Sequence, residues 1–164
     1  MPYILDDLKE QLTELLDNMI IDELITSANG VENNQHFKIY KKEWMDDDNL
    51  FEFHYEIQQN KVHPEIFYLR IDCHFHPYGE SANLNREQYI EQYGENNVYK
   101  RIALMKDVDN NININEARVY RQRWSYNSVW CSKWDLSTIE LPHADFVKNI
   151  IENTFEVVDL TYKK

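Results

Sequence analysis

The chain has 164 residues, and 17 lysine and arginine side chains against 29 aspartate and glutamate give a formal net charge of −12. This length fits one domain, residues 1–164. The 43% of apolar residues excludes a disordered chain, and a total of three glycines excludes a glycine-rich phosphate-binding loop.

The cysteines and the N-terminus predict a cytoplasmic protein. Cys73 and Cys131 form no C-x-x-C pair, so neither a zinc ribbon nor a disulfide framework is expected. The first residues reach Asp6 and Asp7 without a basic segment, unlike a secretory signal peptide. Charged residues interrupt the apolar runs, so we expect no membrane-spanning helix and no membrane partner.

The first predicted element is a long helix over residues 3–27. Its apolar residues recur at steps of three and four, which is the spacing of one face of a helix. Pro2 and Gly30 lie where helices commonly begin and end. We expect the outer face to carry the carboxylates Asp6, Asp7, Glu10, Glu14 and Asp17.

Three strands are predicted next, over residues 36–45, 50–59 and 65–78, because apolar and polar residues alternate in them. Residues 46–49 form a polar turn between the first two. The alternation predicts a sheet with one apolar face, packed against the first helix, and one polar face.

The second half of the chain is predicted to contain two helices and about three strands. Asn85 or Asn83 can cap a short helix over residues 86–93, which Gly94 ends. The predicted strands cover residues 98–108, 112–126 and 128–136, with a turn at 109–111, and a final helix begins after Pro142. The fold class is therefore α+β: a mostly antiparallel sheet of about six strands, with a long N-terminal helix, a short middle helix and a C-terminal helix packed on it.

Ionisable side chains gather on the polar face of the second and third predicted strands. They are Glu52, His54, Glu56, Arg70, Asp72, His74 and His76. If His54 lies opposite Asp72, then Glu56 faces Arg70 and Glu52 faces His74, and every pair attracts. We expect this register, with solvent-facing pairs that contribute about 0.2–1 kcal/mol each.

The same residues leave two other functions open. Two imidazoles and a carboxylate are a common ligand set for zinc or iron, so Asp72, His74 and His76 form a candidate site for a transition metal ion. With Glu52 as the candidate base, the chain would be a metal-dependent enzyme or a degenerate relative of one. The histidine cluster could alternatively respond to pH.

A basic stretch interleaved with aromatic residues is a candidate for nucleic-acid binding. It comprises Tyr99, Lys100, Arg101, Arg118, Tyr120, Arg121, Arg123, Trp124 and Tyr126. Arginine and aromatic side chains can stack on single-stranded nucleic acid. The net charge of −12 opposes contact with phosphates, so direct nucleic-acid binding is not expected.

Negative charge is concentrated in the first third of the chain, where residues 1–60 carry 14 acidic and 4 basic side chains. An acidic surface raises the rate of encounter with a basic partner. The expected partner-binding residues are Asp6, Asp7, Glu10, Glu14, Asp17, Asp46, Asp47 and Asp48. The four tryptophans and 11 tyrosines could serve as interface anchors or fill the core.

The preferred hypothesis is a small acidic, non-catalytic binding or inhibitor protein without a cofactor. In its acidity, its size and its lack of a catalytic motif, the chain is similar in type to immunity proteins that neutralise nuclease toxins. It is equally similar in type to phage inhibitors of host defence nucleases. The resemblance implies a basic protein partner such as a nuclease.

Overall fold

The computed structural model describes residues 5–22, 25–26, 34–44, 51–60, 63–75, 85–112, 119–120, 128–139 and 142–163. Its helices are α1 (Leu5–Leu15), α2 (Arg86–Tyr93), α3 (Glu95–Asn111) and α4 (His143–Lys163), with short 3-10 turns η1 (Lys42–Trp44) and η3 (Leu136–Thr138). Its strands are β1 (Ile20–Ile21), β2 (Ile25–Thr26), β3 (Asn34–Tyr40), β4 (Phe51–Asn60), β5 (Ile66–Phe75), β6 (Val119–Tyr120) and β7 (Ser128–Asp135).

The strands form one antiparallel sheet in the order β1-β3-β4-β5-β7-β6, and β2 also pairs with β3. Seven strands lie in the described residues, three of them only two residues long, against about six expected. The predicted fold class, α+β with an antiparallel sheet, is confirmed.

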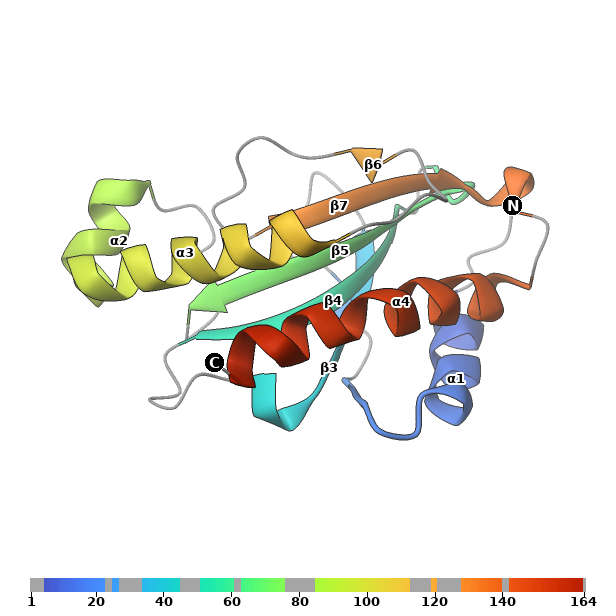
Figure 1. Ribbon diagram of the computed structural model, residues 1–164. Coiled ribbons are helices and arrows are strands. Elements are labelled where there is room, and N and C mark those ends of the chain that lie inside the picture. The colour runs from blue at the N-terminus through green and yellow to red at the C-terminus, as the bar shows by residue number, and fades with distance from the viewer. Residues whose placement is uncertain are drawn as a thin grey trace.

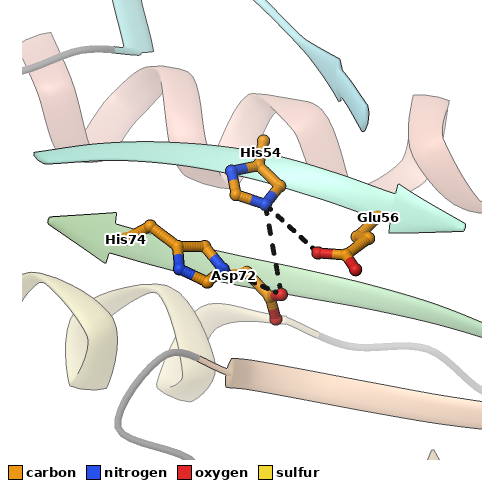
Figure 2. A group of neighbouring side chains, drawn as sticks. All are labelled: His54, Glu56, Asp72 and His74. Carbon is orange, nitrogen blue, oxygen red and sulfur yellow. Dashed lines mark hydrogen bonds and ion pairs between the residues drawn. The ribbon is translucent and has the colours of Figure 1, made fainter. Parts of the chain in front are cut away.

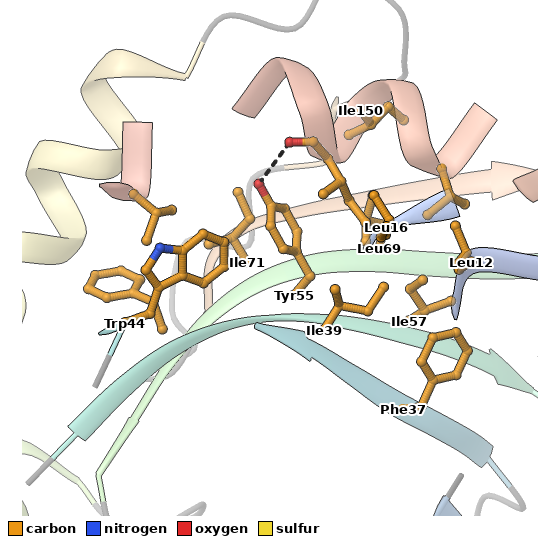
Figure 3. Close-up of a cluster of buried hydrophobic side chains, with 14 of the residues drawn as sticks. Leu12, Leu16, Phe37, Ile39, Trp44, Tyr55, Ile57, Leu69, Ile71 and Ile150 are labelled. Carbon is orange, nitrogen blue, oxygen red and sulfur yellow. Dashed lines mark hydrogen bonds between the residues drawn. The ribbon is translucent and has the colours of Figure 1, made fainter. Parts of the chain in front are cut away.

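The helices cover one face of the sheet, where α3 and α4 run roughly along the strands (Figure 1). The apolar residues of β3, β4 and β5 meet them there in one core, including Ile39, Tyr55 and Ile71 (Figure 3). The Tyr55 hydroxyl is hydrogen-bonded to the hydroxyl of Thr154 on α4, which satisfies both buried groups. The alternation predicts that this face packs against the first helix, and α1 does place Leu5, Leu8 and Leu12 in the same core, beside α4 and β3.

The first helix is shorter than predicted, because it ends at Leu15 instead of continuing to residue 27. Asp17 and Asn18, which favour turns, follow it, and Ile20 and Ile21 then pair with Tyr40 and Ile39 of β3. These two β-branched residues continue the apolar spacing of the helix, but they form β1, a short strand at the edge of the sheet.

The region predicted as a strand over residues 98–108 is helical, and it belongs to α3. Val98, Arg101, Val108 and Ile112 are buried, a spacing of three, seven and four residues that fits a helix. The predicted turn at 109–111 is the last part of α3. The buried arginine hid this pattern, because a charged residue is expected to face solvent.

The predicted short helix over residues 86–93 is confirmed at both ends as α2. Asn85 caps it through a hydrogen bond from the Gln88 amide, and the Gln88 side chain accepts in return from the Asn85 amide. Gly94 follows with φ 91°, a conformation that favours glycine, and separates α2 from α3. The predictions of β4, of β7 and of a C-terminal helix after Pro142 are also confirmed.

None of the helices in the described ranges is both long enough and apolar enough to cross a membrane.

Candidate metal centre

The candidate site lies on the face of the sheet opposite the core, on the adjacent strands β4 and β5. The register of this hairpin is the one predicted from charge: His54 lies opposite Asp72, Glu56 opposite Arg70 and Glu52 opposite His74. Alternation explains why these side chains share a face, since the residues between them, such as Phe53 and Tyr55, point into the core.

Four of the ionisable side chains of this face are buried, in contrast to the solvent-facing ladder expected from the sequence. His54 is 0% exposed and Asp72 1%, while Glu52 and Glu56 are 5% and 7% exposed. Charges out of water are costly unless they are paired, because burial removes several kcal/mol of hydration from each ion. The surface estimate of about 0.2–1 kcal/mol per pair therefore does not apply to them.

Four of these side chains converge on one point between the strands (Figure 2): His54 and Glu56 from β4, and Asp72 and His74 from β5. Each offers one ligand atom, and all four atoms lie within 4.8 Å of one another. The His54 and His74 rings stack with an interplanar angle of 7° and a centroid distance of 4.9 Å.

The separations within the group suit a transition metal ion. His54 Nε2 lies 3.5 Å from Glu56 Oε2 and 4.0 Å from Asp72 Oδ2, and His74 Nε2 lies 3.4 Å from Asp72 Oδ2. Four ligands that each bind zinc at about 2.0–2.1 Å in a tetrahedron are about 3.4 Å apart. The group therefore needs only small movements to surround one ion.

Glu52 positions the ring of His54. Its Oε1 atom lies 3.3 Å from His54 Nδ1, while Nε2 of the same ring faces Glu56 and Asp72. When the ring is neutral with its proton on Nδ1, toward Glu52, the lone pair of Nε2 is available to an ion; a charged ring releases its Nε2 proton as the ion binds. Metal-binding histidines commonly have a carboxylate partner of this kind, which fixes the tautomer and the ring orientation.

The electrostatics of the group favour a positive charge at His54. Burial lowers the pKa of His54, but Glu52, Glu56 and Asp72 outweigh this effect and raise the pKa above its ordinary value. Burial raises the pKa of Glu56, but the adjacent imidazole of His54 and the charge of Arg70 bring it well below its ordinary value. Glu56 is therefore a carboxylate at neutral pH, as a metal ligand must be.

His74 differs from His54 in both charge and access. Burial lowers the pKa of His74, and Asp72 offsets only part of this effect. His74 is therefore neutral at neutral pH and can act as a ligand without losing a proton. Its side chain is 16% exposed, more than the other three members of the group, so the group is most accessible from this side.

Of the candidate metal ligands predicted from the sequence, Asp72 and His74 belong to the group, and His76 lies outside the described residues. Sequence reasoning did not select His54 and Glu56 as ligands. The register expected from the sequence could have identified His54, because it places this residue directly across from Asp72.

The residues predicted to bind a partner occupy two regions. Asp6, Asp7, Glu10, Glu14 and Asp17 are all exposed, the first four on α1 and the last in the turn after it. The other three, Asp46, Asp47 and Asp48, lie outside the described residues. The α1 carboxylates are on the helical side of the sheet, away from the candidate metal centre.

The basic stretch considered for nucleic-acid binding is divided in the structure. Arg101 is buried, donates a hydrogen bond to the Cys73 carbonyl at 3.0 Å, and lies over the rings of Phe75 and Tyr89. Arg118, Arg121, Arg123, Trp124 and Tyr126 lie outside the described residues. Cys73 is buried, and Trp44 and Trp134 belong to the core.

No family model matches the chain, and neither a curated protein nor a solved structure shows significant similarity to it.

Proposed function

We propose that this protein binds one divalent transition metal ion through His54 Nε2, Glu56, Asp72 and His74. The observation that supports this most strongly is the convergence of two imidazoles and two carboxylates, three of them buried, within 4.8 Å. A buried ion pair network is weak evidence for a stabilising role, because apolar replacements of similar volume are often as stable. Metal binding gives these buried charges a function.

The donor set indicates the class of metal. Two nitrogen and two oxygen donors suit zinc, iron or manganese, whereas calcium and magnesium are bound mainly by oxygen. A metal ion held by such residues can polarise a carbonyl or phosphoryl oxygen and activate water. Such chemistry needs an open coordination position, which a site with four protein ligands gains only by accepting a fifth ligand or releasing one of the four. On that condition the proposal extends to a metal-dependent enzyme, or a degenerate relative of one, with the accessible side at His74 as the place where a substrate would approach.

The proposal is tested by zinc titration of the full chain after removal of metal with a chelator. The wild-type protein is expected to bind one zinc ion per chain, and His74→Ala to bind it at least about tenfold more weakly, since one ligand is lost. His63→Ala is the matched control, because His63 is 66% exposed and outside the group. Equal zinc affinity in wild type and His74→Ala would refute the site.

A second proposed function is the binding of a basic protein such as a nuclease, as an immunity or inhibitor protein would do. The exposure of all five predicted carboxylates in and after α1 supports it.

We expect Asp7→Lys/Glu10→Lys/Glu14→Lys to abolish capture of a basic protein at low salt. Glu87→Lys/Glu91→Lys/Glu95→Lys makes the same charge change on exposed positions of α2 and α3, and should leave capture intact. Equal capture by both variants would exclude α1 from the interface.

A further inference from the structure

Arg70 lies beside the candidate metal centre and contacts two of its carboxylates. Its Nη2 atom is 2.8 Å from Glu56 Oε1 and 3.4 Å from Asp72 Oδ2. The cross-strand register places Arg70 directly opposite Glu56, and the arginine side chain is 25% exposed. Arg70 is thus an integral part of the network on this face of the sheet.

The contact divides the two oxygens of Glu56 between different partners. Oε1 accepts the hydrogen bond from Arg70, while Oε2 faces His54 Nε2 at 3.5 Å. A guanidinium that hydrogen-bonds one carboxylate oxygen takes up one of its lone pairs and part of its negative charge, so the other oxygen is the stronger donor to a metal ion. Arg70 therefore favours binding of Glu56 through a single oxygen, Oε2.

We propose that Arg70 determines the metal preference of the site by keeping the coordination number low. This inference rests on the proposed metal binding. Zinc is satisfied by four ligands in a tetrahedron, and the two histidines, Asp72 and one oxygen of Glu56 supply four. Manganese suits octahedral sites with more oxygen donors, so it would gain from the second oxygen of Glu56. Arg70 withholds that oxygen and thereby favours zinc over manganese.

The ratio of zinc to manganese affinity is the quantity to measure. Removal of the Arg70 charge strengthens the binding of any divalent ion, and a general loosening of the site weakens the binding of any ion. Both effects largely cancel in the ratio, because the two ions carry the same charge. A change in the ratio therefore reports on coordination and not on stability.

The experiment compares metal-free full-length wild type with Arg70→Gln, using a chromophoric competitor for Zn²⁺ and electron paramagnetic resonance for Mn²⁺. The zinc-to-manganese affinity ratio is expected to fall about tenfold or more in Arg70→Gln, as expected for one added ligand. Lys133→Gln removes an exposed positive charge on β7, the other neighbour of β5, and should leave the ratio unchanged. Arg70→Met replaces Arg70→Gln if the latter does not fold.

A second pair of variants tests whether Arg70 acts on the metal preference through Glu56. Glu56→Gln has one amide oxygen, so the further change Arg70→Gln in that background should leave the ratio unaltered. If wild type binds zinc and the ratio stays constant in Arg70→Gln, Arg70 does not set the preference, while the proposed metal site stands. If wild type binds neither ion, the proposed function fails and this inference fails with it.

Discussion

At the scale of single residues, His54 is the centre of the account, because each of its ring nitrogens faces a carboxylate and the ring is fully buried. Nδ1 faces Glu52, and Nε2 faces Glu56 and Asp72. Removing one partner of a buried charge network leaves another charge without compensation, which commonly costs about 3–5 kcal/mol. Variants of this group should therefore be compared for folding as well as for binding.

The role assigned to Glu52 makes a specific prediction. Glu52→Gln keeps the shape of the side chain but weakens its hold on the His54 Nδ1 proton, so zinc affinity should fall about 10- to 100-fold. Competition with a chromophoric chelator measures this affinity. Glu65→Gln, whose side chain is 41% exposed and lies outside the group, serves as the control. Zinc affinity in Glu52→Gln equal to that of the control would show that Glu52 does not orient the ring.

Tyr40 gives a pH-dependent prediction independent of metal binding. Burial and the carboxylate of Asp22, which accepts a hydrogen bond from the Tyr40 hydroxyl, raise the pKa of Tyr40 to about 12. An unfolded tyrosine ionises near pH 10, so the stability from this group is present below about pH 10 and is lost as pH rises to about 12. Denaturant unfolding should show the advantage of wild type over Tyr40→Phe shrinking across that range. A constant difference would contradict this assignment.

At the scale of elements, charge complementarity was sufficient to predict the register of β4 and β5. Only one alignment pairs His54 with Asp72 and Glu56 with Arg70, and the structure has that alignment. The burial of the same face was not predictable, because the local sequence does not show what the rest of the chain leaves open to solvent. Without burial, the group looks like an ordinary surface ladder of ion pairs.

The two errors in helix prediction have distinct physical causes. In α3 the buried position Arg101 is charged, and its cost is offset by the Cys73 carbonyl and by two aromatic rings, which are contacts far away in the sequence. After α1, Ile20 and Ile21 keep the helical spacing, but pairing with β3 decides their conformation. In both places tertiary contacts outweigh the local pattern.

The packing of α1 leads to a stability prediction. Leu12 is 0% exposed in the core, whereas Leu15, one turn later, is 37% exposed. Leu12→Ala should lower the free energy of unfolding by about 2–5 kcal/mol through lost burial and a residual cavity. Leu15→Ala should lower it by less than about 1 kcal/mol. Denaturant unfolding monitored by circular dichroism measures both, and equal losses would show that α1 is not anchored through this face.

At the scale of the whole molecule, the two faces of the sheet have different tasks. The face toward α3 and α4 holds the apolar core, and the opposite face of β4 and β5 holds the histidines and carboxylates (Figures 1 and 2). The rigid pairing of β4 with β5 fixes the ligand positions, since sites built on strands hold their geometry better than sites on loops. The acidic face of α1 is separate from this site, so metal binding and partner binding can be tested independently.

X-ray absorption spectroscopy of the full chain loaded with one equivalent of zinc tests the central claim most directly. The account predicts four nitrogen or oxygen neighbours at about 2.0–2.1 Å, with the multiple scattering of two imidazole rings. Loss of one imidazole contribution in His74→Ala, but not in His63→Ala, would assign the signal to this site. A sulfur neighbour at about 2.3 Å, or an oxygen shell without imidazole, would contradict the proposed centre.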